Sequence, residues 1–180
     1  QGAAYMATGA ALATGRPQAF CVVPGPGFLN ATAALSTAYA VNAPVLALAG
    51  QIPLGAQGKG HGLLHEIPDQ FGILERLTKS SHRITGPADA AATLQAAFRD
   101  LKSGRPRPVG LEVAVNLWGQ AVADAGSGLK IGPDATPPLD ADALDQAARL
   151  IAAAGSPMIV VGGGAQDDAE AVRQLAARIG

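Results

Sequence analysis

The chain has 180 residues, of which 48% are hydrophobic and 15% are charged, so it can bury a sizeable core and falls in the soluble globular class of one or two domains. Its formal net charge of −1 comes from basic and acidic side chains that are scattered along the sequence, which argues against a nucleic-acid surface because phosphate binding needs clustered positive charge. Cys21 is the single cysteine, which excludes a disulfide framework and a cysteine metal cluster. The lack of disulfides agrees with a cytoplasmic location.

The first predicted element is a helix over residues 1–14, which ends at Gly15 and Pro17, a typical stop signal. Glycines interrupt its apolar residues and it lacks a basic leader, so we predict neither a signal peptide nor a membrane-spanning helix. Nothing before Gly2 resembles an N-cap, and the first residue is not methionine. We therefore expect the chain to be a fragment of a longer protein.

A predicted strand at residues 19–23 breaks into the turn Gly25-Pro26-Gly27, and a helix follows from about Phe28 to Val41. The turn then lies at the carboxyl end of a buried strand, where ligands bind in open α/β sheets because the next helix offers unpaired N–H groups. The glycines permit close approach of a ligand and Pro26 stiffens the loop. A tight strand-to-helix turn without a ligand is the alternative.

Strands and helices continue to alternate as far as residue 114. The further elements are predicted strands at 45–49, 80–84 and 109–114, predicted helices at 69–77 and 87–102, and a glycine-rich loop at 50–62. Near-continuous apolar strands that alternate with helices are typical of a parallel sheet with helices on both faces. The predicted fold is therefore α/β, a doubly wound parallel sheet.

A change of composition divides the chain. Residues 124–138 are rich in Gly, Pro and Asp and bury little apolar surface, so we predict a linker between a domain at 1–123 and a second domain at 139–180. In the second domain Asp140 is the predicted cap of a helix, Met158 to Val161 a predicted strand, and 167–179 a further helix. This order predicts the start of a second, truncated α/β domain.

A series of separated motifs runs through the chain in a fixed order. They are Gln1-Gly2-Ala3-Ala4-Tyr5-Met6-Ala7, Ala13-Thr14-Gly15-Arg16-Pro17, Gly25-Pro26-Gly27 with Asn30, Ala38-Tyr39, Pro44, Gly50-Gln51, Asp69-Gln70, Leu77-Thr78-Lys79, Gly104-Arg105-Pro106, Pro108-Val109 and Glu112-Val113. In order and spacing they resemble the pyrimidine-binding domain of thiamine-diphosphate enzymes of the acetolactate synthase and benzaldehyde lyase group. Met158 to Gly164 resembles the opening of that group's central domain.

The resemblance implies that thiamine diphosphate and magnesium are cofactors of the parent enzyme. Gly25, Pro26 and Gly27 would pack against the aminopyrimidine ring, and Asn30 would hydrogen-bond nearby; a helix N-cap is the alternative role for Asn30. The family's catalytic glutamate would directly precede Gln1, and its magnesium motif belongs to another domain, so no metal site is expected here and the fragment is expected to be inactive. FAD binding stays open.

His65 is the candidate catalytic residue. At this position the family patterns usually carry a glutamine near the substrate, followed in acetolactate synthases by a glutamate, here Glu66. A histidine suits acid–base catalysis near neutral pH, and a solvated loop histidine is the alternative. His61 and His65 have the spacing of a helical metal pair, but the neighbouring Gly60 and Gly62 disfavour a helix.

The resemblance thus implies a 2-oxo acid carboligase or decarboxylase of acetolactate synthase type. Histidine at position 65 favours the first alternative, an aldehyde lyase or a non-carboligating decarboxylase of the same family. An alternative of another class is a non-catalytic α/β domain that binds a nucleotide or a partner chain. The expected partners are a small 2-oxo acid or acyloin and further copies of the subunit in a homodimer or homotetramer, with no nucleic acid and no membrane.

Overall fold

The computed structural model describes residues 1–122 and 138–180. The chain divides into two compact units, Gln1–Asp134 and Ala135–Gly180, and each is described by itself. The predicted linker at 124–138 lies, except for its last residue, outside the described residues.

In the described residues, the first unit is built on a four-stranded parallel sheet with the strand order β1-β2-β4-β3. Its strands are β1 (Gln18–Val22), β2 (Val45–Gln51), β3 (Ser80–Ile84) and β4 (Val109–Ala114), and its helices are α1 (Gly2–Thr14), α2 (Pro26–Ala40), α3 (Gln70–Leu77) and α4 (Ala90–Lys102). Because all the pairings are parallel, the carboxyl ends of the four strands meet at one edge.

Among the helices of the described ranges, none combines the length and the apolar composition that a membrane span requires.

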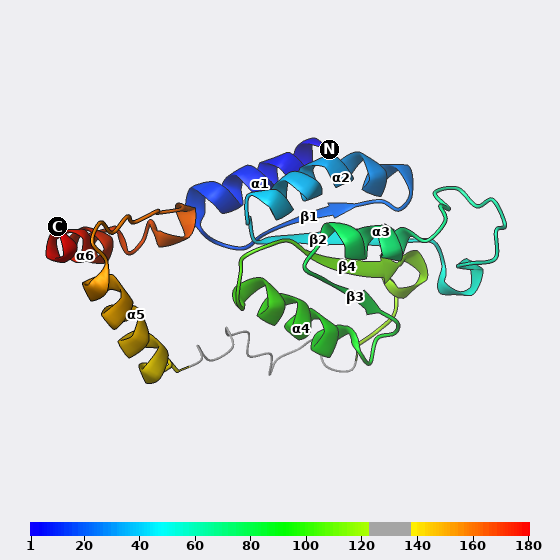
Figure 1. Cartoon of the computed structure of the whole chain (residues 1–180). Helices are drawn as coiled ribbons and strands as arrows, with labels where there is room; N and C mark the ends of the chain where they lie inside the picture. The colour runs from blue at the N-terminus through cyan, green and yellow to red at the C-terminus, as the bar shows by residue number, and fades with distance from the viewer. Residues whose placement is uncertain (123–137) are drawn as a thin grey trace. The chain divides into compact units, whose positions relative to one another are not determined.

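Two apolar layers, one on each face of the sheet, form the core. Val45, Ala47 and Ala49 of β2 pack in one layer with α1, α2 and α3. The alternate residues Leu46 and Leu48 pack in the other layer with α4. Figure 1 shows α1 and α2 over one face of the sheet and α4 over the other. Helices on both faces confirm the predicted α/β fold.

Two predictions about the first strand and the next helix are wrong in detail. β1 is an edge strand, because it pairs with β2 alone. Phe20 is buried and Cys21 is exposed, whereas the apolar composition of the segment had suggested a buried strand. Helix α2 begins at Pro26, two residues earlier than predicted, with Gly25 as its N-cap residue. The turn is therefore the start of the helix, where the fixed φ of proline suits the first helical position.

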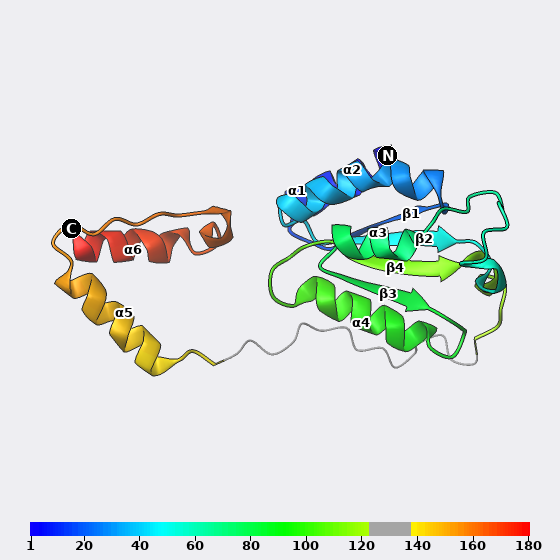
Figure 2. The same ribbon diagram turned by 45° about the vertical axis from the view of Figure 1, so that its right-hand side comes forward.

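The second unit contains helices α5 (Ala141–Ala153) and α6 (Ala169–Ile179). The predicted cap is confirmed, since the Asp140 side chain accepts hydrogen bonds from the N–H groups of Asp142 and Ala143 at 3.0 and 3.1 Å. The predicted strand at Met158–Val161 is wrong, because this segment forms no strand in the described structure (Figure 2). A strand needs a neighbour to accept and donate its backbone hydrogen bonds, and the described residues of this unit contain none.

Candidate functional site

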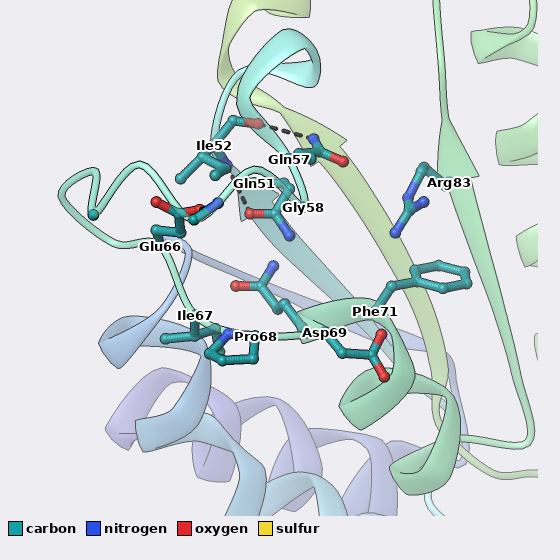
Figure 3. Close-up of a pocket in the computed structure, with 13 residues that line it drawn as sticks. Gln51, Ile52, Gln57, Gly58, Glu66, Ile67, Pro68, Asp69, Phe71 and Arg83 are labelled. Carbon is teal, nitrogen blue, oxygen red and sulfur yellow. Dashed lines mark hydrogen bonds between the residues drawn. The ribbon is translucent and has the colours of Figure 1, made fainter.

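An open pocket of about 780 Å³ lies at the carboxyl edge of the sheet (Figure 3). Its wall is formed by Gln51 at the end of β2 and residues of the following loop as far as Gly62, by residues 66–71 at the start of α3, and by Arg83 of β3. Small-molecule sites have volumes in this range and occur at this edge of parallel sheets. The pocket is therefore the candidate site of the first unit.

Glu112 of β4 is completely buried and accepts hydrogen bonds from three residues of the pocket wall. Its Oε1 accepts from Arg83 Nε at 2.8 Å. Its Oε2 accepts from Gln70 Nε2 at 3.0 Å and from Gln51 Nε2 at 3.1 Å. A buried carboxylate is costly unless it is paired with a positive charge and further donors, and these three side chains supply both.

The amide of Gln70, the first residue of α3, joins the ends of three strands. Its Oε1 accepts the N–H of Gly25, which follows β1, at 2.8 Å. Its Nε2 donates to the carbonyl of Gly50 in β2 at 2.8 Å and to Glu112 in β4. Gln70 is only 1% exposed, and all its amide atoms are used within the chain. Its contacts therefore hold the edge of the sheet together.

Packing within the chain accounts for both glycines of the predicted turn. Gly25 has φ 59°, in the left-handed region that favours glycine, and a Cβ there would overlap the carbonyl oxygen of His65. A Cβ on Gly27 would overlap the side chain of Val23. Pro26 is exposed at the start of α2. The role of these residues in cofactor binding stays a prediction.

Asn30 lies in the second turn of α2 and is exposed, with no side-chain hydrogen bond to the described residues. The alternative that it caps the helix is wrong, because Gly25 occupies the N-cap position. Its amide is therefore available to a partner outside the chain.

The structure brings His65 beside the turn at Gly25, although the two follow different strands. His65 is half-buried and has φ 71°, a left-handed conformation. The loop before it is held by the Glu66 carboxylate, which accepts the N–H of Gly60 at 3.1 Å and of Leu63 at 2.9 Å. His65 is thus next to the pocket but is not part of its wall.

Comparison with known proteins gives the family. Residues 1–73 match the family described as thiamine pyrophosphate enzyme, N-terminal TPP binding domain. The chain is 34% identical to a probable 2-ketoarginine decarboxylase of Pseudomonas aeruginosa over 99% of the chain and 32% of the relative. It is 34% identical to an acetolactate synthase of Arthrospira platensis, over 92% of the chain and 29% of the relative, and 28% identical to the acetolactate synthase isozyme 1 large subunit of Escherichia coli, over 98% and 31%.

Residues 1–73 belong to the N-terminal TPP binding domain family of the thiamine pyrophosphate enzymes. The whole chain spans about a third of the length of these relatives. The family resemblance that the motifs indicate is therefore confirmed. The matched residues include the turn at Gly25 and the loop with His65.

The sequence does not single out Arg83, Gln70 or Glu112 as a connected group of this thiamine pyrophosphate domain. The sequence does contain a signal that Glu112 has partners, because it is an acidic residue in the middle of an apolar strand and such residues are buried only when they are paired. Its partners cannot be read from the sequence.

In the described part of the chain, no group of three or more His, Cys, Asp or Glu side chains is placed to hold a metal ion.

Proposed function

We propose that this chain holds the aminopyrimidine ring of thiamine pyrophosphate in an enzyme that acts on 2-oxo acids. The observation that carries the proposal is the exposed start of α2 beside a pocket at the carboxyl edge of the sheet, inside the residues that match the family. Pro26 and Leu29 offer exposed apolar carbon to a ring face, and the Asn30 amide offers a donor and an acceptor. These groups suit an aminopyrimidine.

When bound, thiamine pyrophosphate supplies the nucleophilic carbon and the electron sink for reactions at the carbonyl of a 2-oxo acid. The residues of this chain would position the cofactor and the substrate and would transfer protons. Gln70 and Glu112 fix the turn and the pocket relative to each other through the hydrogen bonds described above. His65, next to the turn, would act as a general acid or base toward the substrate. The fixed geometry would keep the turn and the pocket in place for the substrate.

The leading reaction is carboligation or decarboxylation of acetolactate synthase type, as the names of several relatives suggest. A second candidate, decarboxylation without carboligation, is favoured by His65 and by the relative named as a probable 2-ketoarginine decarboxylase. For such a substrate, the carboxylates of Glu66 and Asp69 in the pocket wall would suit a guanidinium tail. Membership of an enzyme family makes a non-catalytic binding domain the weaker alternative.

The proposal includes magnesium as a second cofactor, a homodimer or homotetramer, and a cytoplasmic location. The exposed apolar side chains of Val23, just before α2, and of Leu29, in its first turn, would support pairing of subunits. We expect the 180-residue chain alone to be inactive, because the resemblance assigns the catalytic glutamate and the magnesium motif to other parts of the enzyme. FAD is left open in this proposal.

The test is an assay of the natural full-length protein that contains this chain. CO₂ release and acetolactate formation are measured with pyruvate and with 5-guanidino-2-oxopentanoate, with and without thiamine pyrophosphate and magnesium. We expect turnover that depends on the cofactor. Asn30→Ala should raise the apparent KM for the cofactor by about tenfold, the scale of one lost polar contact, whereas Ser36→Ala, at an exposed site on the same helix, should not. Lack of cofactor-dependent turnover with every 2-oxo acid tried would refute the proposal.

A further inference from the structure

Glu112 determines which way two glutamine amides face. A carboxylate that is paired with arginine only accepts hydrogen bonds, so the NH₂ groups of Gln51 and Gln70 point toward it. The Oε1 of Gln51 also accepts the N–H of Ile52 at 2.8 Å, which fixes this amide from both ends. Gln70 uses its second N–H on the carbonyl of Gly50. The second N–H of Gln51 has no partner in the described residues.

Arg83 is held by two contacts that leave its outer nitrogens unused. Its Nε donates to Glu112 Oε1 at 2.8 Å, and its guanidinium carbon lies 4.3 Å from the centre of the Phe71 ring (Figure 3). Neither Nη atom has a hydrogen-bond partner in the part of the chain that is described. The side chain is 37% exposed and lines the pocket. Because its orientation is already fixed, a ligand that binds it would cost little additional conformational entropy.

Gln51 and Arg83 are neighbours, since they donate to the two oxygens of one carboxylate. Their remaining N–H groups therefore form a donor-rich part of the pocket wall. Parallel N–H groups of arginine bind planar carboxylates through two hydrogen bonds. This part of the wall is chemically suited to a carboxylate oxygen pair.

Two acidic side chains line the same pocket but do not compete for these donors. Glu66 accepts the backbone N–H groups of its own loop, and Figure 3 shows it on the opposite side of the pocket from Arg83. Asp69 caps α3 by accepting the N–H of Gly72 at 3.1 Å. The donors of Arg83 and Gln51 thus remain for a ligand.

We propose that Arg83 and Gln51 form a carboxylate subsite in this pocket, with Glu112 as its positioning residue. The ligand class is a small 2-oxo acid, and this part of the inference rests on the proposed function. Glu112 itself does not touch the ligand. It acts by orienting the Arg83 guanidinium and the Gln51 amide before the ligand arrives.

The experiment is an NMR titration of the ¹⁵N-labelled 180-residue chain with pyruvate, in which the Arg Nε–H and Gln Nε2–H signals are followed. The signals of Arg83 and Gln51 should shift in a saturable manner. Arg83→Lys keeps a positive charge beside Glu112 but lacks the guanidinium fork, so it should raise the Kd at least tenfold. An unchanged Kd in Arg83→Lys, or no saturable shift, would overturn the subsite.

Arg107 provides a matched control. Its guanidinium carbon lies 4.0 Å from the centre of the Tyr39 ring and its Nε donates to Asn42 at 3.2 Å, but it precedes β4 and so lies toward the opposite edge of the sheet. Its signal should stay in place, and Arg107→Lys should leave the Kd for pyruvate unchanged. Equal effects of the two substitutions would show a general response to charge and overturn the assignment.

Glu112→Gln tests the positioning role. The new side chain keeps one acceptor but loses the charge that orders both donors, so the Arg83 Nε–H signal should move in the free protein and the Kd should rise at least threefold. If Glu112 were only structural, Glu112→Gln would lower the stability of the protein but leave the Kd of the folded protein for pyruvate unchanged. That result would overturn the positioning role of Glu112. If Glu112→Gln does not fold, Gln51→Met tests the subsite instead. This variant should raise the Kd for pyruvate at least threefold, and an unchanged Kd would overturn the subsite.

Two further ligands distinguish the chemistry. Pyruvamide, which lacks the charge, should bind at least tenfold more weakly than pyruvate, and tighter binding of inorganic phosphate would overturn the carboxylate assignment. Because no thiamine pyrophosphate is present, this titration measures binding of the 2-oxo acid without turnover. Turnover by the full-length protein without binding at Arg83 would overturn only the subsite, and binding without cofactor-dependent turnover would overturn only the proposed function.

Discussion

The backbone carbonyl of His65 lies so close to Gly25 that any side chain at position 25 would overlap it. This contact joins the loop after β2 to the first residue before α2, the two segments in which the predicted site residues occur. The three atoms of His65 that lie nearest to that position all belong to its backbone. A change of the His65 side chain therefore leaves these three atoms in the chain.

Gly25→Ala should destabilise the protein by about 1–3 kcal/mol, because the new methyl group overlaps the His65 carbonyl and the residue must keep a left-handed conformation. The free energy of unfolding from denaturant titration measures this effect. Gly9→Ala in α1 is the control, since nothing lies within 4 Å of a Cβ there, and it should be neutral or stabilise by up to about 1 kcal/mol. Equal stabilities of the two variants would contradict the packing described.

Gln70→Leu should destabilise by about 2–4 kcal/mol, because it leaves the N–H of Gly25, the carbonyl of Gly50 and the Glu112 carboxylate with fewer partners in a buried place. Gln120→Leu, at an exposed position, should change stability by less than about 0.5 kcal/mol. Both are measured by chemical denaturation. A loss for Gln70→Leu no larger than that of the control would show that the amide does not hold the sheet edge.

Acid should weaken the contact between β3 and α4 at Asp100. Burial alone would raise the pKa of this carboxyl, but hydrogen bonds from Ser80 and His82, and the charges of His82 and Lys79, hold the pKa below its ordinary value. A lowered folded-state pKa means that the stabilisation is complete above the unfolded-state pKa of about 3.9 and is lost as the pH falls through the folded-state pKa.

The matched comparison for this effect is Asp100→Asn. The wild type should be more stable than the variant at about pH 6, and the difference should shrink between about pH 5 and about pH 2. Unfolding free energies at a series of pH values measure it. A difference that stays constant over this range would mean that the titration of Asp100 does not contribute.

His65→Ala in the full-length enzyme should lower kcat by about 10²-fold, the scale of a positioned acid–base group, with little change in the affinity for thiamine pyrophosphate. His65→Gln restores the amide of the family pattern and should shift the preference among 2-oxo acids. His61→Ala, at an exposed position of the same loop, is the control and should leave kcat unchanged. Full activity and unchanged preference in both His65 variants would make His65 a structural loop residue.

Local patterns in the sequence predict most of the elements correctly. Gly15 ends α1 in the left-handed conformation with its N–H bonded to the carbonyl of Ala11, and Asp140 caps α5, as their residue types indicate. Strand composition does not reveal position in a sheet, so β1 was expected to be buried and Met158–Val161 to be a strand. Burial and pairing depend on neighbours from elsewhere in the chain.

The sequence by itself determined the α/β fold of the first unit and the thiamine pyrophosphate family, because hydrophobic periodicity and ordered motifs are local properties. Only the tertiary structure decided that Glu112 orients Gln51, Gln70 and Arg83, and that His65 lies against Gly25. These contacts join residues that are distant along the chain but close at the edge of the sheet, where parallel strands end together. No spacing rule in the sequence specifies such contacts, since they depend on strand order and register, which the packing of the whole domain sets.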